Sequence, residues 1–266
     1  MQNELCCQGI LIKSDMSKKK IQIDEIQGSL AQHAYETIRN AILKGELGLG
    51  APLSRRGLAE QLGMSLLPVS EGLQRLEMEG LVESRPRVGT RVRVPSSQDI
   101  RGHYVIREAL ETQSARLYTE KASQMERREL TEFAIRVDTM YADPDKDLFE
   151  TFSEHERLHR RISECTGCPM LVEAIEKSHV LIFNWHYNSA THFRELPRRW
   201  HQDLIRALNS GDVDVADRKM REHCHYGMEE VLRRIEATLN PNDAGRRSTV
   251  GKLLPQPGRV RKPKDQ

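Results

Sequence analysis

The feature that most constrains this chain is a change of periodicity after Gly80 in an otherwise helical pattern. Before Gly80, apolar residues recur every three or four positions, as they do on one face of a helix. Within Leu81–Val94, valine alternates with arginine or threonine, which is the two-residue period of a strand. The turn-forming segment Arg85–Gly89 interrupts this alternation. We therefore predict a β-hairpin with a basic tip.

The residues before this hairpin predict three helices. The first covers Ser29–Lys44, and a second, short helix begins after Ser54 and ends at Gly63. Ser65 is the expected N-cap of a third helix, which Gly80 ends, since serine accepts the unpaired N–H groups of a first turn and glycine follows a last turn. Two short helices joined by a tight turn and followed by a basic hairpin are typical of a winged helix-turn-helix.

The rest of the chain returns to helical periodicity. From about residue 99 to 238 the pattern predicts roughly six helices, with breaks near Pro144, Gly167–Pro169, Pro197 and Gly211. We expect a mainly α protein with a winged helix-turn-helix over residues 29–95 and an all-helical bundle over 99–238. Residues 95–97 are the expected hinge. Residues 1–28 are predicted to be a disordered leader and residues 240–266 a disordered basic tail.

Hydropathy and cysteine content indicate the cellular location of the protein. No apolar run approaches the ~20 residues that a membrane helix needs, and no signal peptide is evident. The five cysteines form no disulfide framework, and the lone pair Cys165 and Cys168 has no second pair with which to bind zinc. We therefore expect a cytoplasmic protein that is not associated with a membrane.

Four histidines lie on apolar helix faces. His155 and His159 are four residues apart on one stripe, while His201 and His223 belong to the apolar stripes of two further helices. Each fits a hydrogen-bonded core histidine, but imidazoles that converge from a bundle can also bind a divalent transition metal. Zn²⁺ is the expected ion, and Ni, Cu and Fe also suit neutral imidazole.

Residues 30–94 resemble the GntR family of transcriptional regulators. The motifs that carry this resemblance are Gly45–Leu47, Leu53–Arg56, Leu62–Ser65, Pro68–Val69, Glu79–Val82 and Gly89–Thr90. That family commonly carries an arginine two residues before the Pro-Val pair and another directly after it, where this chain has Leu66 and Ser70. Gly72 replaces the usual alanine.

The resemblance and the basic wing together imply binding to double-stranded DNA, with the second helix of the motif in the major groove. Helix-turn-helix units also serve as scaffolds in proteins that do not bind DNA. The residues that we expect at the DNA interface are Arg56, Ser65, Leu66, Leu67, Ser70, Arg75, Arg85, Arg87, Gly89 and Arg91.

Residues 99–236 resemble the FCD effector domain of the FadR-type subfamily of GntR regulators. The motif residues are Arg107, Leu110–Glu111, His159, Gly167–Leu171, His201, Gly211–Asp212 and His223. In that family three histidines and an aspartate bind a metal beneath the effector. His159, His201 and His223 match the three histidines, and His155 stands at the aspartate position.

The same resemblance implies a small organic or sugar acid as the effector. Arg107 matches an arginine that could hold the effector carboxylate by a bidentate pair, and Asn184 and His186 are further candidates for the pocket. A surface salt bridge is the other reading of Arg107.

We therefore predict a ligand-responsive regulator, a repressor rather than an enzyme, that binds a pseudo-palindromic operator as a homodimer. Two alternatives stay open. One is a metal-dependent enzyme that uses the histidine site, which would leave residues 29–94 without a purpose. The other is a metal sensor in which the ion itself is the effector.

Overall fold

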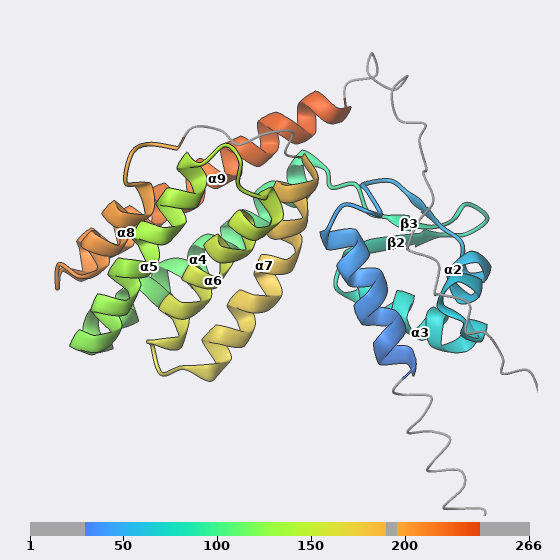
Figure 1. The fold of residues 1–266 in the computed structure, drawn as a ribbon, viewed down its shortest axis with the longest axis horizontal. Coiled ribbons are helices and arrows are strands. Elements are labelled where there is room, and N and C mark those ends of the chain that lie inside the picture. The colour runs from blue at the N-terminus through green and yellow to red at the C-terminus, as the bar shows by residue number, and fades with distance from the viewer. Residues whose placement is uncertain (1–29, 190–195, 240–266) are drawn as a thin grey trace, which may run out of the picture. The chain divides into compact units, whose positions relative to one another are not determined.

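The computed structural model describes residues 30–189 and 196–239, and these form two compact units. Residues 30–42 and Gly50–Arg93 make up the first unit, while residues 43–49 and the described residues from Val94 onward make up the second. Figure 1 shows the strands in the first unit and a bundle of helices in the second. The predicted leader and the predicted tail lie outside the described residues.

The first unit is a helix-turn-helix with a three-stranded antiparallel sheet. A helix over residues 30–43 precedes β1 (Pro52–Leu53), α2 (Arg55–Leu62), α3 (Leu66–Met78), β2 (Val82–Arg85) and β3 (Gly89–Val92). Strands β2 and β3 form the predicted hairpin, in which Val82 pairs with Val92 and Arg85 with Gly89. Strand β1, which the hydrophobic periodicity did not predict, pairs with the other edge of β3.

Local signals explain most boundaries of this unit. The side chain of Ser54 accepts the Gly57 N–H at 3.2 Å, and Gly63 ends α2 with a φ of 64°, which glycine adopts without strain. Ser65 precedes α3 without a side-chain cap hydrogen bond, so the predicted cap is wrong in that detail. Helix α3 buries Val69 and Leu73 in the core of the unit.

Within its described residues, the second unit contains six helices, as predicted. They are α4 (Ser97–Lys121), α5 (Gln124–Ala142), α6 (Leu148–Glu164), α7 (Pro169–Ser189), α8 (Trp200–Leu208) and α9 (Val213–Leu239). The boundary between α4 and α5 was not predicted, and there Ser123 and Glu126 form a capping box. The expected hinge over 95–97 is too long, because Ser96 and Asp99 already form the capping box of α4.

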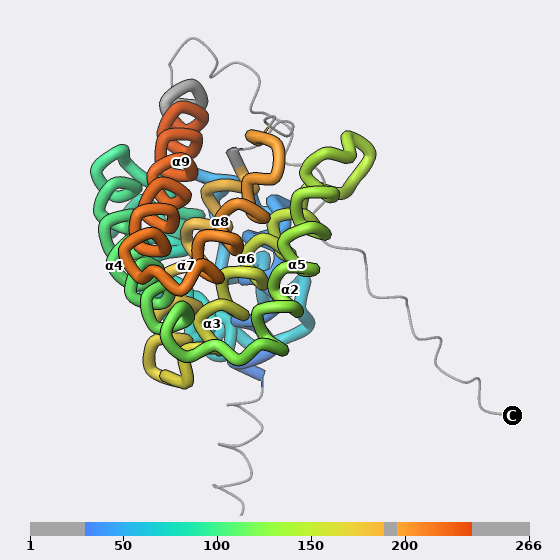
Figure 2. Tube along the Cα trace, turned by 90° about the vertical axis from the view of Figure 1, so that its left-hand side faces the viewer, coloured from blue at the N-terminus to red at the C-terminus, as the bar shows by residue number. Residues whose placement is uncertain are grey.

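The core of the second unit lies between helices that are far apart in the sequence. Helices α4 and α9 run side by side along the bundle (Figure 2). Leu130, Leu158, Leu204 and Met220, from four different helices, belong to one buried cluster. The inward faces that carry these residues also carry the buried histidines. Among the described residues, no helix is long and apolar enough to cross a membrane.

Candidate metal centre and DNA-binding surface

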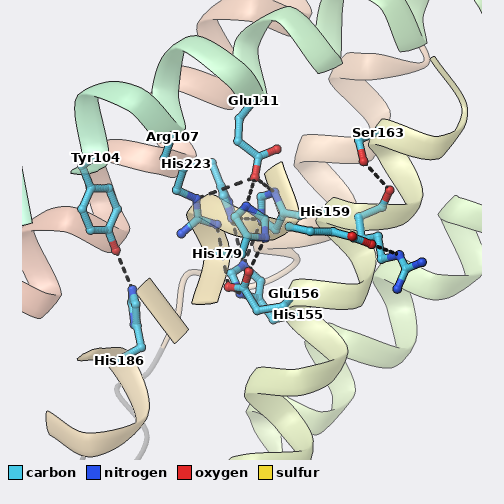
Figure 3. A network of polar contacts seen from close by, with 12 residues as sticks. Tyr104, Arg107, Glu111, His155, Glu156, His159, Ser163, His179, His186 and His223 are labelled. Carbon is cyan, nitrogen blue, oxygen red and sulfur yellow. Dashed lines mark hydrogen bonds and ion pairs between the residues drawn. The ribbon is translucent and has the colours of Figure 1, made fainter. Parts of the chain in front are cut away.

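Three of the four predicted histidines meet at one point inside the second unit. Helix α6 supplies His155 and His159 one turn apart, and α9 supplies His223 (Figure 3). Their Nε2 atoms lie 3.1 Å apart for His155 and His159, 3.1 Å for His159 and His223, and 3.2 Å for His155 and His223. All three side chains are buried. The arrangement is therefore a triangle of ring nitrogens with almost equal sides.

Two carboxylates, of the buried Glu111 and the partly buried Glu156, favour one position of the proton on the rings of the α6 histidines. Oε1 of Glu111 lies 2.9 Å from Nδ1 of His159, and Oε1 of Glu156 lies 3.4 Å from Nδ1 of His155. A carboxylate beside Nδ1 favours the tautomer with a proton there, so the Nε2 atoms of His155 and His159 point their lone pairs at one another. Burial lowers the pKa of His155 and of His223 well below the usual range, which keeps both rings neutral.

Converging lone pairs repel each other unless a cation lies between them. Ligand nitrogens ~2.0–2.1 Å from one tetrahedral ion are roughly 3.3 Å apart, close to the 3.1–3.2 Å sides of this triangle. Neutral imidazoles are good ligands for Zn²⁺ and for its neighbours among the transition metals. The donor set therefore fits a divalent transition metal.

His201, the fourth predicted ligand, lies beside the triad. Its ring centroid is 5.1 Å from that of His155 and 5.4 Å from that of His223. Its Nδ1 is 2.7 Å from Oδ1 of Asp138, which also accepts the His201 backbone N–H at 3.0 Å. Asp138 thus holds the ring in the tautomer that leaves Nε2 unprotonated.

A buried ion network surrounds the triad, and most of it was missed at the sequence level. His179 of α7 bridges two carboxylates, with Nε2 2.6 Å from Glu111 and Nδ1 2.5 Å from Glu156. These carboxylates outweigh the effect of burial and raise the pKa of His179 to about 9, so the ring is an imidazolium. Arg107 lies 3.7 Å from Glu111 and 3.9 Å from Glu156. Two cations therefore balance two anions, and the network as a whole is neutral.

Of the three predicted effector residues, Arg107 and His186 line a cavity and Asn184 does not. A cavity beside the triad is lined by Arg107, Tyr141, Phe152, His155, His186, Leu196, Trp200, His201, His223, Tyr226, Gly227, Glu230 and Arg234. Nε2 of His186 is 2.7 Å from the Tyr104 hydroxyl, and burial lowers the pKa of His186 to about 3. Asn184 is buried, accepts hydrogen bonds from Asn188 and does not line this cavity.

Some of the predicted DNA-contacting residues of the helices are exposed, and others make contacts within the protein. Arg56 and Ser65 are exposed, and Leu66 and Leu67 of α3 are 49% and 53% exposed. The Ser70 hydroxyl donates to the Leu66 carbonyl at 2.8 Å. The Arg75 guanidinium stacks on the Tyr35 ring at 4.1 Å and hydrogen-bonds Gln32, so it connects α3 to the first helix of the unit.

The wing carries its charge at the turn. Arg85, Arg87 and Gly89 are exposed, and Arg87 and Gly89 form the turn with φ values of 63° and 102°. Arg91 forms an ion pair with Glu83, whose carboxylate also lies 3.4 Å from Arg85. The tip therefore keeps Arg87 as a positive charge toward solvent.

Comparison with protein families decides the class of this architecture. The family model of the bacterial regulatory proteins of the gntR family matches residues 30–92, and that of the FCD domain matches residues 103–226. The two matches together span more than half of the chain and fall on its two units. The chain belongs to the GntR family.

Relatives of this GntR protein are regulators of transcription. The HTH-type transcriptional repressor RspR of Escherichia coli (strain K12) is 26% identical over 206 residues, which cover 75% of this chain and 88% of RspR. The HTH-type transcriptional regulator McbR of the same strain is 26% identical over 216 residues, 79% of this chain and 93% of McbR. The GntR protein is therefore a transcriptional regulator and not an enzyme, as predicted.

Solved structures confirm the fold. The E. coli McbR/YncC structure aligns with a TM-score of 0.59 at 24% identity and covers 79% of this chain and 99% of its own. A GntR protein from Rhodococcus sp. RHA1 aligns with a TM-score of 0.64 at 20% identity and covers 77% and 98%. This chain thus shares its mainly helical fold with these two solved proteins.

Proposed function

We propose that this GntR regulator is a metal-dependent, ligand-responsive repressor. His155, His159 and His223 would hold a divalent transition metal, and His201 would supply a fourth imidazole. The observation that carries this proposal is the triangle of Nε2 atoms 3.1–3.2 Å apart in a buried site. Zn²⁺ is the ion that we expect, and Ni, Cu and Fe suit the same donors. A bound ion would supply positive charge beside the cavity.

The cavity next to the triad supports a small organic or sugar acid as the effector. Arg107 lines it, and its Nε and Nη2 atoms, which form ion pairs of 3.7 and 3.9 Å with Glu111 and Glu156, have no hydrogen-bond partner among the described residues. A carboxylate is the group that pairs best with two such donors. His186, held neutral by burial and hydrogen-bonded to the Tyr104 hydroxyl, lines the same cavity.

The first unit would bind a pseudo-palindromic operator in the cytoplasm, with one copy of the unit on each half-site of a homodimer. A repressor named among the relatives supports the direction of regulation. Val105 and Ile106 on α4 are 69% and 53% exposed, and an apolar pair of this kind supports contact with a second copy. Ligand in the second unit would then change the affinity of the dimer for DNA.

Metal content tests the site directly. Chelated full-length protein is dialysed against Zn²⁺, and bound metal is measured by elemental analysis. Wild type should retain one ion per chain, and His159→Ala should lose it. His225→Ala is the matched control, because this α9 histidine has a side chain that is 57% exposed and lies two residues from His223. Equal metal content in wild type and His159→Ala would refute the site.

DNA binding tests the regulator. Fluorescence anisotropy is measured at one fixed salt concentration with duplexes from the protein's own promoter region. The protein should prefer particular sequences, and small carboxylic acids should alter its affinity for them only when metal is present. A response to metal alone would instead identify a metal sensor. Absence of sequence preference under all conditions would refute the DNA-binding role of the first unit.

A further inference from the structure

The first turn of α3 presents two apolar side chains to solvent. Leu66 and Leu67 are 49% and 53% exposed, whereas Val69, Leu73 and Leu76 of the same helix are buried. The core of the unit is therefore complete without them. Two adjacent exposed leucines at the start of a helix suggest a contact that is made only in a complex.

Two polar side chains of this helix, those of Arg75 and Ser70, are engaged within the protein. Arg75 is the only cationic residue within α3, and its guanidinium is stacked on Tyr35 and hydrogen-bonded to Gln32. The Ser70 hydroxyl donates its proton to the Leu66 carbonyl. The first turn thus offers apolar surface and no donor of the kind that recognises guanine.

Exposed positive charge elsewhere in the same unit indicates an anionic partner. Arg55 and Arg56 are exposed at the start of α2, and Arg87 is exposed on the wing. The N-terminus of α3 has no side-chain cap, and uncapped N–H groups favour a phosphate. An apolar helix start in a unit that also carries phosphate-binding groups matches the major groove, whose one apolar feature is the thymine C5-methyl group.

We propose that Leu66 and Leu67 select thymine in the operator by packing against its C5-methyl groups. This inference rests on the proposed function, since it requires α3 to lie in the major groove. It assigns the base preference of the first turn of α3 to apolar contact and not to hydrogen bonds. Thymine should therefore dominate the operator positions that face the first turn of α3.

Replacement of thymine by uracil tests this proposal, because it removes the methyl group and leaves every hydrogen-bonding group of the base in place. A preferred duplex is first selected by the full-length protein from a random pool. Its thymines are then changed to uracil one at a time, and affinities are measured by anisotropy. Burial of one methyl is worth ~0.8 kcal/mol, so wild type should bind each critical uracil duplex roughly fourfold more weakly.

The variant Leu66→Ser/Leu67→Ser should bind thymine and uracil duplexes equally, since it has no apolar side chain to pack on the methyl. Both positions are exposed, so this variant should fold, which circular dichroism checks. Met78→Ala is the control, because Met78 is 76% exposed at the other end of α3 and should keep the wild-type response to uracil.

Two results would overturn the proposal while leaving DNA binding intact. One is equal affinity of wild type for thymine and uracil duplexes. The other is an unchanged uracil effect in the serine variant, which would assign the methyl contacts to other residues. If no duplex is selected at all, both this inference and the proposed DNA-binding role fail.

Discussion

Replacing Glu111 by Gln should destabilise the second unit by about 3 kcal/mol at pH 7. Glu111 is fully buried and contacts His179 at 2.6 Å and His159 at 2.9 Å. It also balances the charges of Arg107 and His179. Without this carboxylate, two buried positive charges share the single carboxylate of Glu156, and breaking a buried pair by removing one member costs about 3–5 kcal/mol.

The pKa of His179 provides a second route to the magnitude. That pKa is raised to about 9 from its usual 6.5. At pH 7 the folded protein lies about 2 pH units below it, and at ~1.36 kcal/mol per unit the bound proton stabilises the fold by about 2–3 kcal/mol. A raised pKa in the folded state means that this contribution is complete below pH 6.5 and disappears as the pH rises through 9. Glu111→Gln removes one of the two carboxylates that hold the proton.

Urea unfolding of metal-free protein measures the effect. Both tryptophans of the chain, Trp185 and Trp200, belong to the second unit, so their fluorescence reports on that unit. Glu120→Gln, an exposed position on the same helix, is the control and should unfold like wild type. The difference in free energy of unfolding between wild type and Glu111→Gln should become smaller above pH 9. If Glu111→Gln unfolds at the same urea concentration as Glu120→Gln, the charge-balance argument is wrong.

Two further predictions concern packing and thiol chemistry. Gly72→Ala would place a new Cβ 2.9 Å from the Tyr35 backbone nitrogen. Overpacking costs about 1–3 kcal/mol, while alanine gains about 1 kcal/mol of helix propensity. The variant should therefore destabilise the first unit by about 1 kcal/mol. Gly57→Ala is the control and should not destabilise the first unit, because its new Cβ would meet only ordinary contacts from 3.4 Å. Thermal unfolding followed by circular dichroism compares the two variants. Equal melting temperatures would contradict the packing argument. Burial raises the pKa of Cys224 to about 12, so peptide mass spectrometry after iodoacetamide treatment at pH 8 should find Cys168 modified well before Cys224. Comparable rates at the two thiols would contradict this prediction.

At Gly72, helix propensity and packing lead to opposite conclusions about the effect of glycine on stability. In the sequence, Gly72 stands where the related family has alanine, and helix propensity alone counts it as a loss of about 1 kcal/mol. In the structure the backbone of the first helix passes so close that a Cβ would collide with it. The glycine therefore permits a close helix contact that propensity cannot reveal.

The sequence by itself determined the local structure and the inward direction of the histidines. Caps such as Ser54, glycine ends such as Gly63 and the two-residue period of the hairpin depend on neighbours within a few positions. The same is true of the shared face of His155 and His159, which follows from the helical repeat.

Only the tertiary structure decided which groups meet. It joined His223 to the α6 pair, placed His201 on Asp138 and brought Glu111 of α4 to His179 of α7. It also added β1 to the sheet and turned Arg75 toward Tyr35. These contacts join residues tens of positions apart, and no local hydrogen bond or periodicity specifies them. They depend on how whole helices pack, which is set by the summed burial of many side chains.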